Sequence, residues 1–294
     1  MDYIYSVVIL VGLSIILASS FNLSIGYGGL ISIAHPVFYA IGAYASALLS
    51  RDAGVPVVVS IFVGALVALV ASVMVALPSL RVSGDYLMIA SIGFQLGVLE
   101  LIKNVNWTGG AGGLTNIPAF IAPTFGREAY VLLVLIAAAL TILIIYRIAH
   151  GPIGRAMSAM RDDELAFLAL GRNATSLKVG IFALGSGIAG FAGALYAHYF
   201  RYLTPEQFDI LQSSALLTMV VVGGIRTAWG PVIGAVVLQV LPQAIAFLDL
   251  PTSFLGPLQG LLFTGLVLIF MFVRPQGLVS AGAVWRPLRR SGAA

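Results

Sequence analysis

Few side chains in this sequence could carry out acid–base, nucleophilic or metal chemistry. The chain has no cysteine, and its three histidines, His35, His150 and His198, are widely separated, so they do not suggest a set of metal ligands. The acidic cluster of the chain is Asp162-Asp163-Glu164. Adjacent side chains on a helix point in different directions, so we expect this acidic trio to form a solvated or protein-contacting face. The sequence predicts no catalytic, cofactor-binding or metal site in this chain.

Two further patterns bear on nucleotide chemistry. The segment Gly185–Gly190 fits the glycine pattern of dinucleotide-binding loops, but it lies inside an apolar run with no strand before it. The sequence has no phosphate-binding loop of the G-x-x-x-x-G-K-[ST] type, so we expect no ATPase in this chain. We interpret the glycines as packing positions, because small residues four apart let membrane helices approach closely. Such pairs are Gly93/Gly97, Ala189/Gly193, Gly230/Gly234 and Gly256/Gly260.

The elements that hold these residues are predicted to be membrane-spanning helices. Of the 294 residues, 60% are hydrophobic and 9% are charged, and so few charges could not cover a soluble protein of this size. Apolar runs without period-2 alternation predict helices rather than barrel strands. The net charge of +4 lies in loops, where it indicates orientation rather than nucleic-acid binding. We therefore expect an all-α polytopic transmembrane helix bundle forming one domain over residues 1–294.

The charge-free runs predict eight to ten spans, with nine as the best count. The Gly-rich segment 22–36 could be a broken helix or a re-entrant turn. The run 84–102 has an acidic residue at each end, and 210–225 is short for a crossing. The nine expected spans are 4–21, 30–49, 55–79, 84–102, 129–147, 179–200, 210–225, 229–248 and 255–273.

Basic residues predict the orientation, because cytoplasmic loops of membrane proteins are rich in Lys and Arg. Five basic residues lie from Arg147 to Lys178, and four lie from Arg274 onward. We therefore expect the loop 148–178, the basic tail 274–294 and the C-terminus to be cytoplasmic. The span count then places Arg81 and Arg226 inside, and Arg51, Lys103, Arg127 and Arg201 outside.

The cytoplasmic loop is predicted to contain a short amphipathic helix. Pro152 is well placed to start a helix, Ala156–Leu170 has the amphipathic pattern, and Gly171 is a natural stop. The polar face is acidic as much as basic, which favours a protein partner over an anionic lipid surface. Within the spans the polar residues are uncharged, so the chain fits a passive path or one driven by a partner.

Several blocks of the sequence, from about residue 20 to 240, resemble branched-chain amino acid ABC transporter permeases, in particular their M-type (LivM-like) subunits. Their order along the chain makes the resemblance specific. The blocks are Asn22–Leu30 with Ala34-His35 and Ile41–Tyr44, Arg81–Tyr86 with Ile92–Phe94, Trp107–Gly110 with Gly112–Leu114, Gly154–Gly171, Ala189–Ala197, and Val222–Gly224 with Trp229–Ala235.

This resemblance implies a permease subunit of an ATP-driven importer in the cell (inner or plasma) membrane of a prokaryote. The implied partners are a homologous second permease, two cytoplasmic ATPases that use ATP and Mg, and an extracytoplasmic solute-binding protein. The loop 148–178 would couple the ATPases to the spans, although it matches the general coupling motif of ABC importers only loosely. The implied coupling residues are Gly154, Arg155, Arg161, Asp162, Asp163, Glu164 and Gly171.

Two Gly-rich segments and one polar span position are the candidate lining of the translocation path. Gly28-Gly29 and Gly223-Gly224 each precede a proline by the same distance, a pattern that would fit broken helices in two related halves. Unwound backbone is tolerated at membrane depth only where it faces protein or a cavity. The candidate path residues are Asn22, Gly28, Gly29, His35, Gln95, Gly223 and Gly224.

Other functions stay open at this point. Permeases similar to the family import urea, short amides and other amino acids, and nothing in the sequence selects among these substrates. A secondary transporter or channel would move its substrate without ATP or partners. An intramembrane enzyme acting on lipid would need convergent carboxylates or histidines, which the sequence does not offer.

Overall fold

The computed structural model describes residues 2–30, 32–79, 85–120, 126–246, 265 and 277–279. This part of the chain is helical, and its only extended pairing is an isolated bridge between Leu114 and Leu203. The α-helices are α1 Asp2–Asn22, α2 His35–Arg51, α3 Val57–Ser79, α4 Asp85–Asn104, α5 Gly126–His150, α6 Pro152–Asp162, α7 Glu164–Ala169, α8 Ala174–Phe200, α9 Ile210–Gly223 and α10 Gly230–Ala246. The short elements are the π-helix η1 Leu23–Tyr27 and the 3-10 helices η2 Asn106–Thr108, η3 Gly110–Gly112 and η5 Pro205–Phe208.

Five helical stretches in the described residues are long and apolar enough to cross a membrane, which confirms an all-α polytopic bundle. The expected spans 30–49, 210–225 and 229–248 correspond to the shorter helices α2, α9 and α10. The expected span 255–273 and the tail 274–294 lie almost wholly outside the described residues, so the count of nine stays a prediction. The five long stretches are Tyr3–Tyr27, Val57–Ala76, Tyr86–Asn104, Gly126–His150 and Ala174–Phe200.

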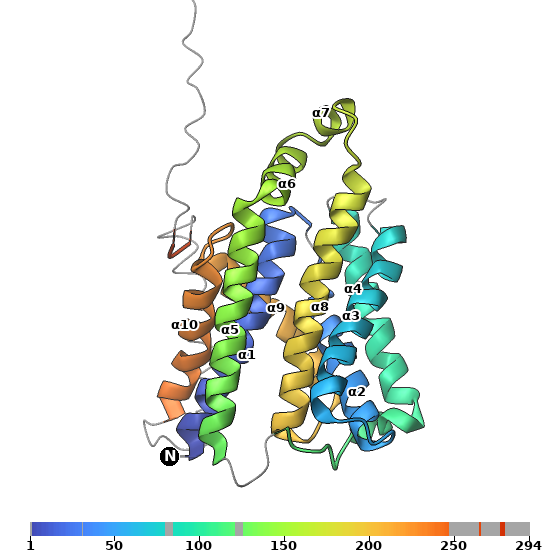
Figure 1. Ribbon diagram of the computed structural model, residues 1–294, viewed down its shortest axis with the longest axis vertical. Coiled ribbons are helices and arrows are strands. Elements are labelled where there is room, and N and C mark those ends of the chain that lie inside the picture. Colours follow the sequence, from blue (N-terminus) through green and yellow to red (C-terminus); the bar gives the residue numbers. More distant parts are fainter. Residues whose placement is uncertain are drawn as a thin grey trace, which may run out of the picture.

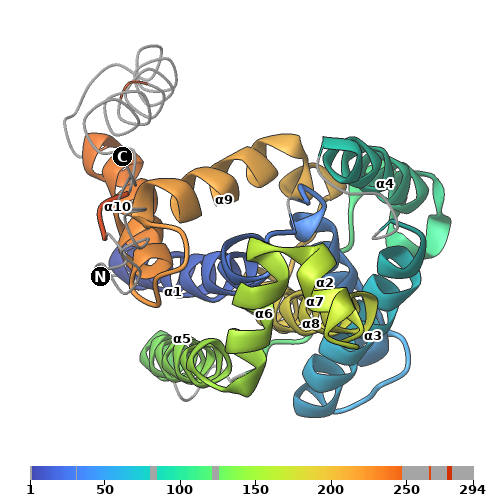
Figure 2. The ribbon, with the colours of Figure 1, turned by 90° about the horizontal axis from the view of Figure 1, so that it is seen from above.

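Helix α8 is the central element of the bundle. It packs along α2 and α3, while α1 packs against α5 and α10 (Figures 1 and 2). Small residues permit the closest of these approaches. A Cβ on Gly193 would lie 2.0 Å from the carbonyl oxygen of Tyr39, and a Cβ on Gly234 would lie 1.9 Å from that of Met219. The packing role predicted for these two glycines is therefore confirmed.

One end of the bundle is held together by the loop after α4. Leu114 and Leu203 exchange both backbone hydrogen bonds, at 2.7 and 3.0 Å. His198 at the end of α8 donates through Nδ1 to the carbonyl of Pro118 at 2.7 Å, and Ser46 Oγ lies 2.9 Å from its Nε2. We call this end, which also contains the last turn of α2, the outer end.

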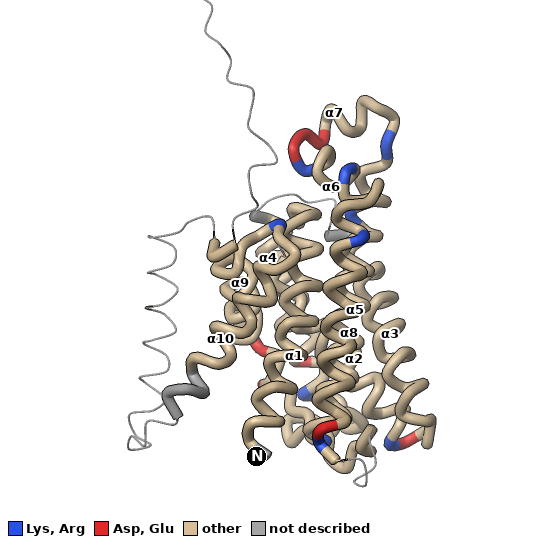
Figure 3. Tube along the Cα trace, turned by 60° about the vertical axis from the view of Figure 1, so that its left-hand side comes forward, with Lys and Arg blue, Asp and Glu red and all other residues tan. Residues whose placement is uncertain are grey.

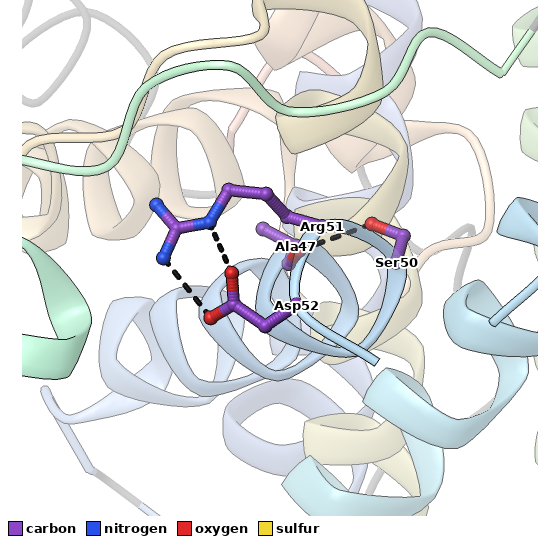
Figure 4. Close-up of polar contacts among 4 residues, drawn as sticks. All are labelled: Ala47, Ser50, Arg51 and Asp52. Carbon is purple, nitrogen blue, oxygen red and sulfur yellow. Dashed lines mark hydrogen bonds and ion pairs between the residues drawn. The ribbon is translucent and has the colours of Figure 1, made fainter. Parts of the chain in front are cut away.

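The last turn of α2 ends in an ion pair (Figure 4). Arg51 donates from Nε to Asp52 Oδ1 at 2.6 Å, and Ser50 Oγ donates to the carbonyl of Ala47 at 3.0 Å. The hydrogen bond from Arg51 holds the pKa of the exposed Asp52 carboxyl below its usual range. The pair lies at the surface of the outer end.

The expectation of one amphipathic helix over 156–170 is wrong. Helix α6 ends at Asp162, Asp163 is extended at φ −154° and ψ 101°, and α7 begins at Glu164. The reason is local: the Asp163 carboxylate accepts a 2.9 Å hydrogen bond from the backbone N–H of Ala166, which makes it an N-cap. The predicted stop at Gly171 is confirmed, because its φ of +73° is in the left-handed region.

Candidate functional site: a helix break and the segment that contacts it

The first feature of the site is a break between α1 and α2. The chain continues from Asn22 into the π-helical turn η1, whose five residues are all buried. Residues 28–30 and 32–34 are then non-helical, and α2 begins at His35 with Pro36 in its first turn. Gly29 has φ +68° and allows the chain to turn away from η1. The sequence left a broken helix or a re-entrant turn open. In the structure the chain reverses between η1 and α2, because Ser6 near the start of α1 and Ser46 near the end of α2 both bond to the last turns of α8.

Asn22 connects this break to the second Gly-rich segment. Its Nδ2 donates to the carbonyl of Thr227 at 2.9 Å, and its Oδ1 accepts from the backbone N–H of Arg226 at 3.1 Å. The hydroxyl of Thr227 in turn donates to the carbonyl of Gly224 at 2.8 Å. Gly223 lies against the start of α10, since a Cβ there would meet the Gly230 carbonyl oxygen at 2.0 Å. The two Gly-rich segments that resemble each other in sequence therefore meet at the same end of the bundle.

The remaining candidate path residues lie further along the helices. His35 Nε2 is 2.9 Å from Ser20 Oγ on α1, and Ser20 donates to the carbonyl of Leu17 at 2.8 Å, so the histidine is the donor to the serine. Gln95 lies apart, between α4 and α9: it donates to the carbonyl of Phe208 at 3.1 Å and accepts from Ser213 at 2.9 Å. The structure thus does not bring Gln95 to the helix break.

The partners Ser20, Ser213 and Thr227 were not predicted from the sequence. Serine and threonine are frequent in membrane helices, and their hydroxyls commonly bond to the carbonyl three or four residues earlier. Ser60 and Ser72 do this at 2.9 and 2.7 Å. No signal in the sequence separates such serines from those that link helices.

The second feature of the site is α6, which docks beside the break. Gly154 is required where α6 leaves α5, because a Cβ there would lie 1.8 Å from the carbonyl oxygen of Ala149. Met157 is fully buried and packs with Leu23, Tyr27 and Ile181. The apolar side of α6 is therefore seated on η1 and on α8.

Arg161 makes the polar link between α6 and the break. Its Nη1 donates to the carbonyl of Gly26, and its Cγ lies 3.0 Å from the position that a Cβ on Gly29 would take. Burial lowers the pKa of Arg161 from its ordinary value, and the neighbouring Arg226 lowers it further. An arginine stays protonated through such a shift, so Arg161 is a cation bonded to the backbone of η1.

The predicted acidic trio does not converge on one point. Asp162 is exposed, Asp163 caps α7, and Glu164 Oε1 bonds to Lys178 Nζ of α8 at 2.6 Å. In the part of the chain that the structure describes, no group of three or more His, Asp or Glu side chains could hold a metal ion. Arg155 is exposed on α6, and Gly171 follows α7. The predicted coupling residues therefore all lie on one segment, but only Arg161 contacts the helix break.

The tip of this segment exposes apolar side chains. Leu165 and Leu170 are 80% and 77% exposed, and Leu168 is half-exposed. Helix α7 stands beyond the ends of the long helices (Figure 1), and charges of both signs surround it (Figure 3). Exposed apolar side chains that are surrounded by polar ones indicate a surface for interaction with a protein or a membrane.

Five helices that are long and apolar enough to cross a membrane define an all-α, multi-pass membrane bundle. A family model described as branched-chain amino acid transport system / permease component matches residues 3–272. This chain belongs to that family of ABC transporter permease subunits, which are not enzymes themselves. No solved structure matches the chain.

Curated relatives agree with the family. The chain is 32% identical to the high-affinity branched-chain amino acid transport system permease protein LivM of Salmonella typhimurium, over 90% of this chain and 67% of the relative. It is 25% identical to a probable LivM of Methanocaldococcus jannaschii, over 97% and 96% of the two chains. It is also 25% identical to LivH, a permease protein of the same kind of system in Escherichia coli, over 90% of each chain. The chain is thus a multi-pass membrane permease.

Proposed function

We propose that this chain is the membrane-spanning permease subunit of an ATP-driven importer of branched-chain or related small amino acids. It works with a homologous second permease, two ATPases that use ATP and Mg, and an extracytoplasmic solute-binding protein, and it holds no cofactor of its own. The end that carries α6 and α7, the tail 274–294 and the C-terminus face the cytoplasm of a prokaryote. Residues 1–294 act as a single permease domain.

The observation that supports this proposal best is the contact between α6 and η1. Met157 packs against Leu23, and Arg161 donates to the carbonyl of Gly26. A push on α6 therefore reaches the break between α1 and α2 directly. Asn22 would transmit this movement to the second Gly-rich segment, because its side-chain amide is bonded to Thr227 and Arg226 between α9 and α10.

The ATPases would contact α7 and the exposed face of α6. Leu165 and Leu170 offer apolar anchors, Asp162 offers a charge at the end of α6, and Arg155 offers another near its start. A partner that covers this tip would remove the leucines from water, which favours docking. Because α6 and α7 form a short segment, we expect them to move together with a partner that binds them.

The π-helical turn supplies the part that can move. A π-helix is rare, and single π-helical turns are frequent at functional sites. Here it is followed by the non-helical residues 28–30 and 32–34. We infer that rearrangement of η1 opens and closes a path near Asn22, Gly28, Gly29, His35, Gly223 and Gly224, with Gln95 further along it.

Reconstitution tests the proposal. Proteoliposomes that contain this permease, its second permease, the ATPases and the binding protein should take up labelled leucine only with ATP, and omission of any one component should abolish uptake. Excess isoleucine or valine should compete, whereas competition by urea or acetamide alone would assign the importer to those substrates. Uptake driven by an ion gradient, with this chain as the only protein, would contradict the proposal.

A further inference from the structure

A long groove separates α5 from α8. Helix α5 packs along α1 and contacts α8 only slightly, and Figure 2 shows it set apart from α8 and α3. Toward the outer end the groove is a cavity of about 610 Å³ between α3, α5 and α8, and toward α6 it is a cavity of about 460 Å³ between α5, α6, α7 and α8. Leu184 of α8 lines both cavities, so they form one continuous space, which we call the α5–α8 groove.

The part of the groove toward the outer end is apolar. Of the described side chains that line it, only Thr141 has a polar group. Its lining on α8 extends from Leu184 to Leu195, a length of about 16 Å at 1.5 Å per residue. A helix about 10 Å wide would need roughly twice the observed volume over this length, whereas a hydrocarbon chain is thin enough to lie there. We therefore expect a lipid chain rather than a protein helix in the groove.

The groove has the length of the hydrocarbon core of a membrane. Helices α5 and α8 are both long and apolar enough to cross a membrane. On α8 the lining runs from Ser176 to Leu195, about 28 Å along the helix axis, and the hydrocarbon core is about 30 Å thick. A lipid whose chain lies in the groove therefore has its headgroup at one of the two ends of this lining.

The end of the groove at α6 and α7 is polar. It is lined by Arg172, Asn173 and Ser176. The Asn173 side chain is already used, because its Oδ1 accepts a 2.9 Å hydrogen bond from the backbone N–H of Ser176. Among the described residues no carboxylate pairs with the Arg172 guanidinium, and Glu164 of α7 bonds to Lys178 at 2.6 Å instead. An unpaired arginine therefore lies where the headgroup of a lipid in the groove would be.

We propose that the α5–α8 groove binds a phospholipid of net negative charge, such as phosphatidylglycerol, with a chain between α5 and α8 and its phosphate at Arg172. Basic pockets between membrane helices bind anionic headgroups, and a guanidinium matches the geometry of a phosphate. The lipid would also contact Ile153 of α6 and Phe167 of α7, which line the same end. The inference goes beyond the proposed function, because it requires only that α5 and α8 span a membrane.

Native mass spectrometry tests the headgroup contact. The full chain, released from membranes that contain phosphatidylglycerol and phosphatidylethanolamine, should retain phosphatidylglycerol in clear excess over phosphatidylethanolamine. Arg172→Gln should lower this retention roughly fivefold. Arg155→Gln is the matched control, because Arg155 is exposed on α6 but does not line the groove, and it should retain the wild-type amount. Equal retention of the two lipids by the wild type, or an equal loss in the two variants, would overturn the proposal.

A substitution that fills the groove tests the chain contact. Leu184→Trp adds bulk where the two parts of the groove meet and should abolish retention of phosphatidylglycerol, although Arg172 is unchanged. Leu143→Trp is the control, because Leu143 is 51% exposed on α5 and does not line the groove. Retention by Leu184→Trp at the wild-type level would contradict the proposed site. Recovery of the wild-type chain with a bound protein and without phosphatidylglycerol would show that a protein occupies the groove, and would also contradict it.

Thermal unfolding of the wild-type chain gives a readout that needs no variant. Because a ligand that binds only the folded state stabilises it, phosphatidylglycerol added to the delipidated protein should raise the melting temperature more than phosphatidylethanolamine does. Glycerol phosphate, which has the phosphate but no chain, should have no effect at the same concentration. An equal rise with glycerol phosphate would assign the site to free phosphates, and an equal rise with phosphatidylethanolamine would mean that the groove does not select charge. Either result would overturn the proposal.

Discussion

The two ends of the bundle are built in different ways. At the outer end the chain bonds to itself: Leu114 pairs with Leu203, and His198 bonds to Pro118 and to Ser46. At the opposite end α6 and α7 touch the bundle through Met157, Arg161 and Glu164, and α7 exposes its leucines. The outer end is therefore held by hydrogen bonds within the chain, whereas in the proposed function the α6–α7 end is the part that moves with a partner protein.

The difference between the two ends predicts different effects of mutations on the stability of the bundle and on the coupling of ATP hydrolysis to transport. Hydrogen bonds between elements far apart in sequence, such as those of His198, oppose unfolding of the whole domain. Contacts of α6 with η1 involve few residues and lie next to a π-helical turn, so they can rearrange at small cost. Changes at the outer end should mainly alter stability, and changes at the α6–α7 end should mainly alter transport.

The largest effect is expected from charge reversal of the acidic trio. Asp162→Lys, Asp163→Lys and Glu164→Lys together remove the cap of α7, replace the Lys178 ion pair by repulsion and invert the charge of the tip. Uptake and recruitment of the ATPase should fall by roughly tenfold or more in membrane vesicles. Glu206→Lys at the outer end is the control, and it should leave both uptake and ATPase recruitment at the wild-type level. Unchanged uptake and recruitment in the triple variant would rule out α6–α7 as the coupling segment.

A smaller but distinct effect is expected at Asn22, where the two Gly-rich segments meet. Asn22→Ala leaves the carbonyl of Thr227 and the N–H of Arg226 without their buried partner, which should cost about 2 to 4 kcal/mol. Uptake should fall more than this loss explains, because the variant also disconnects η1 from the turn before α10. Thermal unfolding and uptake of the same preparation check this, with Ser72→Ala as the control. An Asn22→Ala variant with wild-type uptake would show that the two breaks act independently.

At the outer end, His198→Ala should affect stability and not coupling. The variant removes the hydrogen bonds to Pro118 and Ser46, at a cost of about 1 to 3 kcal/mol. The melting temperature should fall, while the number of substrates moved per ATP hydrolysed should stay at the wild-type value. A changed ratio would mean that the outer end takes part in coupling and would remove the distinction between the two ends.

The smallest effect is expected from the exposed Arg51–Asp52 pair. Because Arg51 holds the pKa of Asp52 below its usual 3.8, any stabilisation is present above that pH and is lost as the pH falls through the lower folded value. Exposed ion pairs contribute little, so Asp52→Asn should leave the melting temperature at pH 7 unchanged. A clear drop at pH 7 that disappears at high salt would show that this end depends on surface charge.

The sequence predicted what depends on composition and local pattern. Apolar runs located the helices, Gly28-Gly29 located the break, and the left-handed Gly171 follows the end of α7 as expected. It did not predict the split at Asp163, because an Asp inside an amphipathic pattern can cap a new helix as readily as lie on one.

The site could be predicted only in part, because its residues meet through contacts distant in sequence. Asn22 bonds to residues about two hundred positions later, and nothing in the local pattern indicates this pairing. The glycine pair Gly93/Gly97 on α4 was predicted to be a packing motif, but no described atom lies within 4 Å of a Cβ at either glycine, so this stays a prediction. Such contacts depend on the tertiary and quaternary arrangement, which a single sequence does not encode in any local signal.

In the proposed mechanism, movement of α6 rearranges the helix break at η1 through Arg161. Removal of the hydrogen bond that Arg161 makes tests this directly. Arg161→Met keeps most of the aliphatic stem and removes the donor to the Gly26 carbonyl. Arg155→Met is the matched control, because Arg155 is exposed on the same helix. In proteoliposomes with the assembled importer, we predict that Arg161→Met retains ATP hydrolysis while uptake per ATP falls roughly tenfold, and that Arg155→Met keeps the wild-type ratio. An unchanged uptake-to-ATP ratio in Arg161→Met would contradict the account.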